Sequence, residues 1–149
     1  MKKIYSIMAL LLTAVFTFTM TSCGDDDDDD NDPKNAKVEV SDLKDTGSAL
    51  TFTISASAQG QSVKGTYFFG YDLRGNITSH VEDYTCSPSA MAASFMAQFE
   101  DDPNIKVLTK NGNKIHIEYD EASLEGMTKD VVKDFVYPQI KKGIYEQFK

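Results

Sequence analysis

The sequence predicts an α+β domain, in which a mostly antiparallel sheet of five to six strands, a meander followed by a hairpin, is packed by two helices. Residues 50–58, 61–71 and 77–85 alternate apolar and polar side chains with the period of two that marks a half-buried strand. Residues 87–100 and 128–149 instead repeat apolar side chains at helical spacing. A half-closed β-barrel plugged by the last helix is the alternative.

The early strands are expected to pair by matching their apolar faces. Residues 36–41 form a short edge strand, and a two-residue turn at 59–60 then places Phe52 opposite Tyr67. A three-residue loop, residues 73–75, places Tyr71 opposite Ile77 and Tyr67 opposite Val81. These registers predict three outward rows: Thr51, Phe68 and His80; Thr53, Thr66 and Glu82; Ser55, Lys64 and Tyr84.

A helix and a hairpin should follow the meander. Ser87 is expected to be the N-cap and Pro88 the first residue of a helix that ends near Glu100. In the hairpin, a three-residue loop of residues 111–113 matches Val107 with Ile117, which a two-residue Asn-Gly turn does not. The hydrophobic match therefore favours the longer loop, with Asn113 in the left-handed conformation.

The C-terminal segment is expected to be helical. Asp120 should cap a short helical turn that ends at Gly126, and Thr128 should cap the last helix. Pro138 lies inside this helix and should kink or split it near Tyr137.

The first residues of the chain predict export and lipidation. Lys2 and Lys3 precede an apolar run, residues 4–20, which is too short and too rich in Thr for a membrane span but typical of a signal peptide. The run closes with Thr21-Ser22-Cys23, which resembles a bacterial lipobox. The resemblance implies removal of residues 1–22 and acylation of Cys23, which would anchor the protein in a membrane.

Six consecutive aspartates follow Gly24 and form the predicted sorting signal: Asp25, Asp26, Asp27, Asp28, Asp29 and Asp30. This arrangement is similar to the export signal of Bacteroidota-type surface lipoproteins. The similarity implies a lipid anchor in the outer membrane with the domain at the cell surface, and a domain facing the periplasm is the alternative. The predicted organisation is a signal peptide (residues 1–22), a lipidated cysteine with an acidic disordered tether (residues 23–35) and one domain (residues 36–149).

The charge distribution argues against nucleic acid as a partner. The net charge is −8, and seven of the 23 acidic residues lie in the tether at positions 25–30 and 32. Neither part has the excess of Lys and Arg that contacts with phosphate groups require.

No catalytic constellation is expected. The chain has two cysteines, and if Cys23 carries lipid, Cys86 is a lone thiol, too far along the strand from His80 for that imidazole to activate it. Two His-x-Glu pairs, His80 with Glu82 and His116 with Glu118, are weak candidates for metal ligands. Both pairs are predicted to lie on the solvent face, where polar residues are ordinary, so no metal or cofactor is expected.

The expected function is therefore non-enzymatic binding of a partner protein, a glycan or a small ligand. The candidate binding residues share the predicted outward face: Phe68, His80, Tyr84 and Lys64. An envelope inhibitor or immunity-like protein is one alternative, and a metal- or thiol-dependent enzyme is a weaker one.

Overall fold

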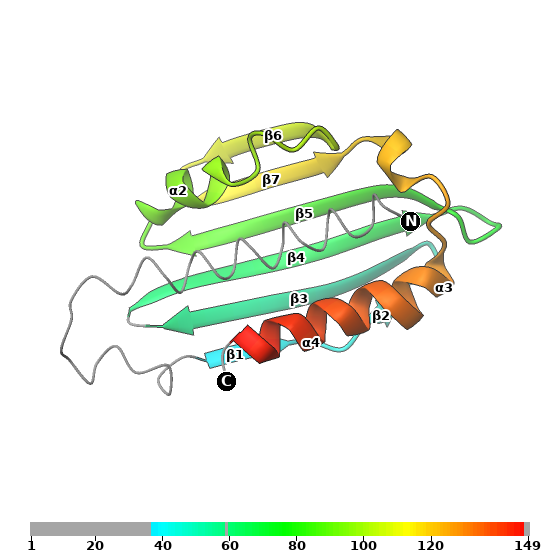
Figure 1. The fold of residues 1–149 in the computed structure, drawn as a ribbon, viewed down its shortest axis with the longest axis horizontal. Helices are drawn as coiled ribbons and strands as arrows, with labels where there is room; N and C mark the ends of the chain where they lie inside the picture. Colours follow the sequence, from blue (N-terminus) through cyan, green and yellow to red (C-terminus); the bar gives the residue numbers. More distant parts are fainter. Residues whose placement is uncertain (1–36, 59, 148–149) are drawn as a thin grey trace.

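A computed structural model describes residues 37–58 and 60–147. The described residues form one open antiparallel sheet in the order β1-β3-β4-β5-β7-β6, with the short β2 paired to β3 (Figure 1). The strand bounds are β1 Lys37–Val40, β2 Lys44–Asp45, β3 Ala49–Ala58, β4 Gln61–Tyr71, β5 Ile77–Ser87, β6 Ile105–Asn111 and β7 Lys114–Tyr119. The α+β prediction is confirmed, β2 was not foreseen, and the alternative of a barrel is wrong because the sheet does not close.

The helices lie on one face of this sheet. Helix α2 (Met91–Ala97) packs on β5, β6 and β7, whereas the C-terminal helix runs along β1 and β3 (Figure 1). That helix consists of α3 (Lys129–Val131), the π-helical segment η4 (Val132–Val136) and α4 (Tyr137–Gln147), and the 3-10 helix η3 (Glu121–Leu124) precedes it. Within the described ranges, no helix has the length and apolar character needed to cross a membrane.

The pairing of β3 with β4 follows the prediction. Phe52 lies opposite Tyr67, and Ile54 lies opposite Gly65. The edge position of the first strand is also confirmed, because β1 pairs only with β3 among the strands of the structure. Matching of apolar faces therefore selects the correct register where the turn leaves the alternation uninterrupted.

The pairing of β4 with β5 departs from the prediction after its first pair. Tyr71 lies opposite Ile77 as expected, but a bulge then shifts the register, so that Phe69 faces His80 and Tyr67 faces Glu82. A bulge adds one unpaired residue to a strand, and everything beyond it changes face. His80, Glu82 and Tyr84 therefore point toward the helices, which corrects their predicted outward placement.

The β6–β7 hairpin has a shorter turn than predicted. Asn111 pairs with Lys114, so that the turn contains Gly112 and Asn113, and Leu108 rather than Val107 lies opposite Ile117. Gly112, with φ +63°, takes the left-handed conformation assigned to Asn113. A register shift in β6 between Ile105 and Val107 then restores the expected pair of Ile105 with Tyr119.

The start of α2 also differs from the prediction. Ser87 remains in β5, paired with Ser62, so it cannot be the cap of a helix. The helix begins at Met91 with Ala90 as its N-cap, and it ends at Ala97, earlier than predicted.

The caps of the C-terminal segment agree with the prediction. The Asp120 side chain accepts a hydrogen bond at the start of η3, and the Thr128 hydroxyl accepts one from the amide of Val131. Pro138 does not split the helix, which is continuous from Lys129 to Gln147, but the helix changes from π-helical to α-helical at Tyr137, where the break was predicted. Since proline lacks the N–H that would bond to Asp134, the preceding turn widens, and the Tyr137 amide bonds to the carbonyl of Val132.

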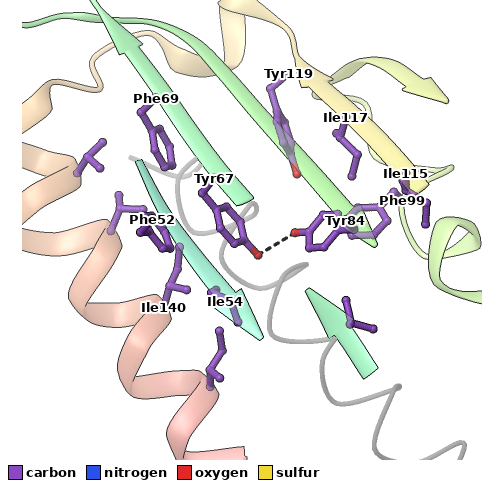
Figure 2. Close-up of a cluster of buried hydrophobic side chains, with 14 of the residues drawn as sticks. Phe52, Ile54, Tyr67, Phe69, Tyr84, Phe99, Ile115, Ile117, Tyr119 and Ile140 are labelled. Atoms are coloured by element: carbon purple, nitrogen blue, oxygen red, sulfur yellow. Dashed lines mark hydrogen bonds between the residues drawn. The ribbon is translucent and has the colours of Figure 1, made fainter. Parts of the chain in front are cut away.

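The core lies between the sheet and the helices. Figure 2 shows Phe52, Ile54 and Ile140 packed at one side of this core and Phe99, Ile115 and Ile117 at the other.

The predicted export and lipidation signals fall in a part of the chain that the structure does not describe. The signal peptide (residues 1–22) and the lipidation residue Cys23 lie outside the described residues. The same holds for every aspartate of the predicted sorting signal: Asp25, Asp26, Asp27, Asp28, Asp29 and Asp30. The assignments of these residues therefore stay predictions.

Candidate functional site

Buried polar side chains gather on the helix-facing side of β4, β5 and β7. We call Tyr67, His80, Glu82, Tyr84 and Tyr119 the Glu82 cluster, and each of the five side chains is buried. Glu82 Oε2 accepts hydrogen bonds from the hydroxyls of Tyr84, at 3.1 Å, and Tyr119, at 3.2 Å. The Tyr67 and Tyr84 hydroxyls are 2.8 Å apart (Figure 2). A carboxylate and three phenols therefore form one connected network.

The direction of each hydrogen bond in this network can be assigned. A phenol carries a single proton, and the proton of Tyr84 is donated to Glu82. Tyr67 must then donate to Tyr84, because Tyr84 has no second proton to offer. Tyr119 donates to Glu82 as well. The three hydroxyl protons are therefore all used inside the cluster.

His80 is the remaining member of the Glu82 cluster, and its imidazole forms no hydrogen bond with the other four side chains. Its ring is stacked between Phe69, at 4.2 Å, and Tyr119, at 4.4 Å between ring centroids. Its Nε2 atom is 3.3 Å from Glu82 Oε1, which is an ion-pair distance, but the angles are not those of a hydrogen bond. Among residues 37–58 and 60–147, both ring nitrogens and Oε1 consequently have no hydrogen-bond partner. Such buried atoms each cost about 1 to 3 kcal/mol when left unpaired.

The phenols of the cluster are held in their neutral form. Burial raises the pKa of Tyr67, Tyr84 and Tyr119 well above 10.0, and the nearby charge of Glu82 raises it further. Removal of a proton from any of them would place a second negative charge in a buried site. The hydroxyls therefore act as fixed donors at physiological pH.

The backbone of β4 makes room for this arrangement. Gly65 lies opposite Tyr84, and a Cβ atom at position 65 would be 2.7 Å from Tyr84 Cε1. A side chain at this position would force the Tyr84 ring to shift from the position in which it donates to Glu82. The glycine therefore positions one of the two donors to the carboxylate.

The residues predicted to form one binding surface are divided between the two faces. Phe68 and Lys64 are exposed on the outer face, and Phe68 has 39% of its surface accessible. His80 and Tyr84 are in the core, and Val81 takes the predicted position of His80 beside Phe68. The outer face therefore keeps an exposed aromatic ring, but without the predicted His and Tyr neighbours.

The two His-x-Glu pairs likewise lie on opposite faces. His116 is on the outer face, where Nδ1 is 2.6 Å from Asp83 and Nε2 is 3.1 Å from Glu118. These two hydrogen bonds raise the pKa of His116 above its ordinary 6.5. The four weak candidates cannot meet at one ion, and residues 37–58 and 60–147 contain no group of three or more His, Cys, Asp or Glu suited to a metal.

Cys86 is buried on the helix side of β5. Burial raises the pKa of its thiol to about 11, so the nucleophilic thiolate is scarce at neutral pH. Asn113 contacts the backbone of Cys86 rather than its sulfur, through both its carbonyl and its side-chain amide. The environment of Cys86 is therefore that of a core residue.

A further polar group fastens β2 to the C-terminal helix. Asp45 accepts hydrogen bonds from the Tyr71 hydroxyl, the Gly47 amide and, at 3.1 Å, Lys133 Nζ. These donors, chiefly Tyr71, lower the pKa of Asp45. The hydrogen bonds of Asp45 therefore join β2, β4 and the C-terminal helix. Both of its carboxylate oxygens have partners, in contrast to Glu82 Oε1.

Sequence reasoning missed the Glu82 cluster because it assigned β5 to the wrong face. The alternation of His80, Glu82, Tyr84 and Cys86 was visible, but the bulge that turns these residues inward was not.

Comparisons with protein-family models, curated proteins and solved structures find no match to this chain.

Proposed function

We propose that the protein is a non-enzymatic lipoprotein of the outer membrane, displayed at the cell surface, and that its domain binds a small ligand at the Glu82 cluster. The lipobox and the aspartate run support the location. The observation that carries the binding proposal is the burial of His80 and Glu82 with three polar atoms that have no hydrogen-bond partner in the described part of the chain. In folded proteins such atoms are nearly always paired, so each exception calls for an explanation, and a bound ligand is one.

The surroundings of the cluster favour binding over catalysis. Aromatic rings dominate it, and a few convergent polar groups in an apolar shell are typical of small-molecule sites. Cys86 has a raised pKa, and His116 uses both ring nitrogens to contact carboxylates. Neither residue resembles an activated nucleophile or a free general base.

A thermal-shift screen of small molecules on the mature, lipidated protein in detergent tests this function. A ligand that binds only the folded state raises the melting temperature, and the shift grows with the logarithm of the ligand concentration above its Kd. We expect ligands that stabilise the wild type and the Phe68→Ala variant, and that stabilise Glu82→Gln much less. Phe68→Ala is the matched control because it alters the opposite face. If every stabilising compound acts equally on Glu82→Gln, the cluster is not the binding site.

The outer face supports a second candidate function, recognition of a glycan or a partner protein. Phe68 is exposed among strand positions occupied by Thr51, Thr53 and Thr66, and an aromatic ring among hydroxyl groups suits either partner. Phe68→Ala should then abolish binding of cells to the partner surface, whereas Glu82→Gln should leave it intact. The reverse pattern would assign recognition to the helix side.

A further inference from the structure

We infer that the ligand of the Glu82 cluster is an organic amine, bound as an ammonium ion, with an apolar or aromatic body. This inference rests on the proposed function and names the chemical class of the ligand. It follows from the supply of hydrogen-bond donors and acceptors in the cluster, from the charge of Glu82 and from the rings around it.

The cluster has acceptors to spare and few donors. The three phenol protons are used within the network, as assigned above. No donor from the residues that the structure describes is aligned with Glu82 Oε1, and the Tyr67 and Tyr119 oxygens each retain acceptor capacity. The imidazole of His80 carries one N–H donor and, in its neutral form, one acceptor nitrogen, so acceptors still outnumber unused donors in the cluster. A guest that completes these bonds must therefore bring donors, and an ammonium group brings three of them.

The charge of the site favours the same group. His80 is the only ion-pair partner of Glu82 among the described residues, and its approach lacks hydrogen-bond geometry. A buried carboxylate is strongly stabilised by a cation with good hydrogen-bond geometry. A hydroxyl guest would supply one donor and no charge, and a carboxylate guest would repel Glu82. An ammonium ion therefore matches the site better than either.

The aromatic residues fit the remainder of such a guest. Tyr84 contacts Phe95 and Phe99 of the α2 region, and Tyr67 is stacked on Phe52 at 4.8 Å. Ring faces attract cations, and ring edges and aliphatic groups pack well in the same shell. The cluster lies on β4, β5 and β7, between the strand covered by α4 and the end of the sheet covered by α2 (Figure 1). The apolar body of the guest would lie among these rings.

Three probes that share a ring and differ in charge test the inference. The probes are 2-phenylethylamine, 2-phenylethanol and 3-phenylpropanoate, titrated at pH 7 into the mature protein by calorimetry. We expect saturable binding of the amine at least ~10-fold tighter than that of the alcohol, and no binding of the acid, since one ion pair of about 1.4 kcal/mol gives a tenfold change. Glu82→Gln should remove the preference for the amine, and Phe68→Ala should retain it.

The outcomes separate the amine inference from the proposed function. Equal binding of amine and alcohol, unchanged in Glu82→Gln, overturns the amine class and leaves a small-ligand site in place. Failure of the amine to bind also overturns the class, whereas the proposed function falls only if the thermal-shift screen finds no ligand that depends on Glu82. Circular dichroism will test whether Glu82→Gln is folded. If it is not, the comparison of the three probes on the wild type still decides whether the site prefers an amine.

Discussion

Adjacent phenylalanines on β4 provide a direct test of which face of the sheet is buried. Phe69 is 1% exposed and stacks on His80 and Phe52, whereas Phe68 is 39% exposed. Phe69→Ala should therefore lower the free energy of unfolding by about 3 to 5 kcal/mol, the range for a fully buried ring. Phe68 hides roughly three-fifths of its surface, so Phe68→Ala should cost about 1 to 2 kcal/mol.

Urea denaturation of the two variants measures this difference. The midpoint should fall much further for Phe69→Ala than for Phe68→Ala, with the slope m unchanged in both, since m reports the surface exposed on unfolding. The two substitutions delete the same atoms from neighbouring positions of one strand, so each is the control for the other. Equal losses of stability, or a larger loss in Phe68→Ala, would show that the assignment of the two faces is wrong.

Three further predictions concern the thiol, the outer histidine and the anchor. Cys86 should react with a thiol reagent at neutral pH only when the protein unfolds, because burial raises its pKa to about 11, and rapid labelling of the native protein would contradict this. His116 should titrate by NMR above 6.5, and Asp83→Asn should lower that midpoint. The stabilisation from its contacts should be complete below pH 6.5 and fade as the pH rises through the raised pKa. Cys23→Ala should abolish incorporation of labelled palmitate, and replacement of Asp25 to Asp30 by Ala should reduce protease accessibility on intact cells while membrane association persists; unchanged accessibility would make the run a spacer.

Much of the fold could be predicted because its determinants are local. Alternation in β3 and β4 fixes which residues share a face, and the short turn between them fixes the register through Phe52 and Tyr67. The caps at Asp120 and Thr128 could be predicted for the same reason, since a cap depends on a side chain and the amides two or three residues away.

The candidate site could not be predicted, because it depends on a shift of one residue in the pairing of β5 with β4. Thr78 has no partner in the β4–β5 ladder, and this single insertion reverses the faces of all following residues of β5. With the bulge, Tyr84 and Cys86 enter the core together with Ile77. Without it, Asp83 would be buried instead, away from the His116 ring that it contacts on the outer face.

The sequence by itself determined the α+β class, every strand except β2, and the caps Asp120 and Thr128. Export and lipidation of the chain stay predictions. Each of these depends on a pattern within a short stretch of residues. The tertiary structure decided which face of β5 is buried, and with it the assembly of Glu82 with three tyrosines and His80. A strand presents its two faces with equal local geometry, so the bulge opposite β4 and packing against β7 and the helices select between them. The strand β7 and the helices lie later in the sequence than β5.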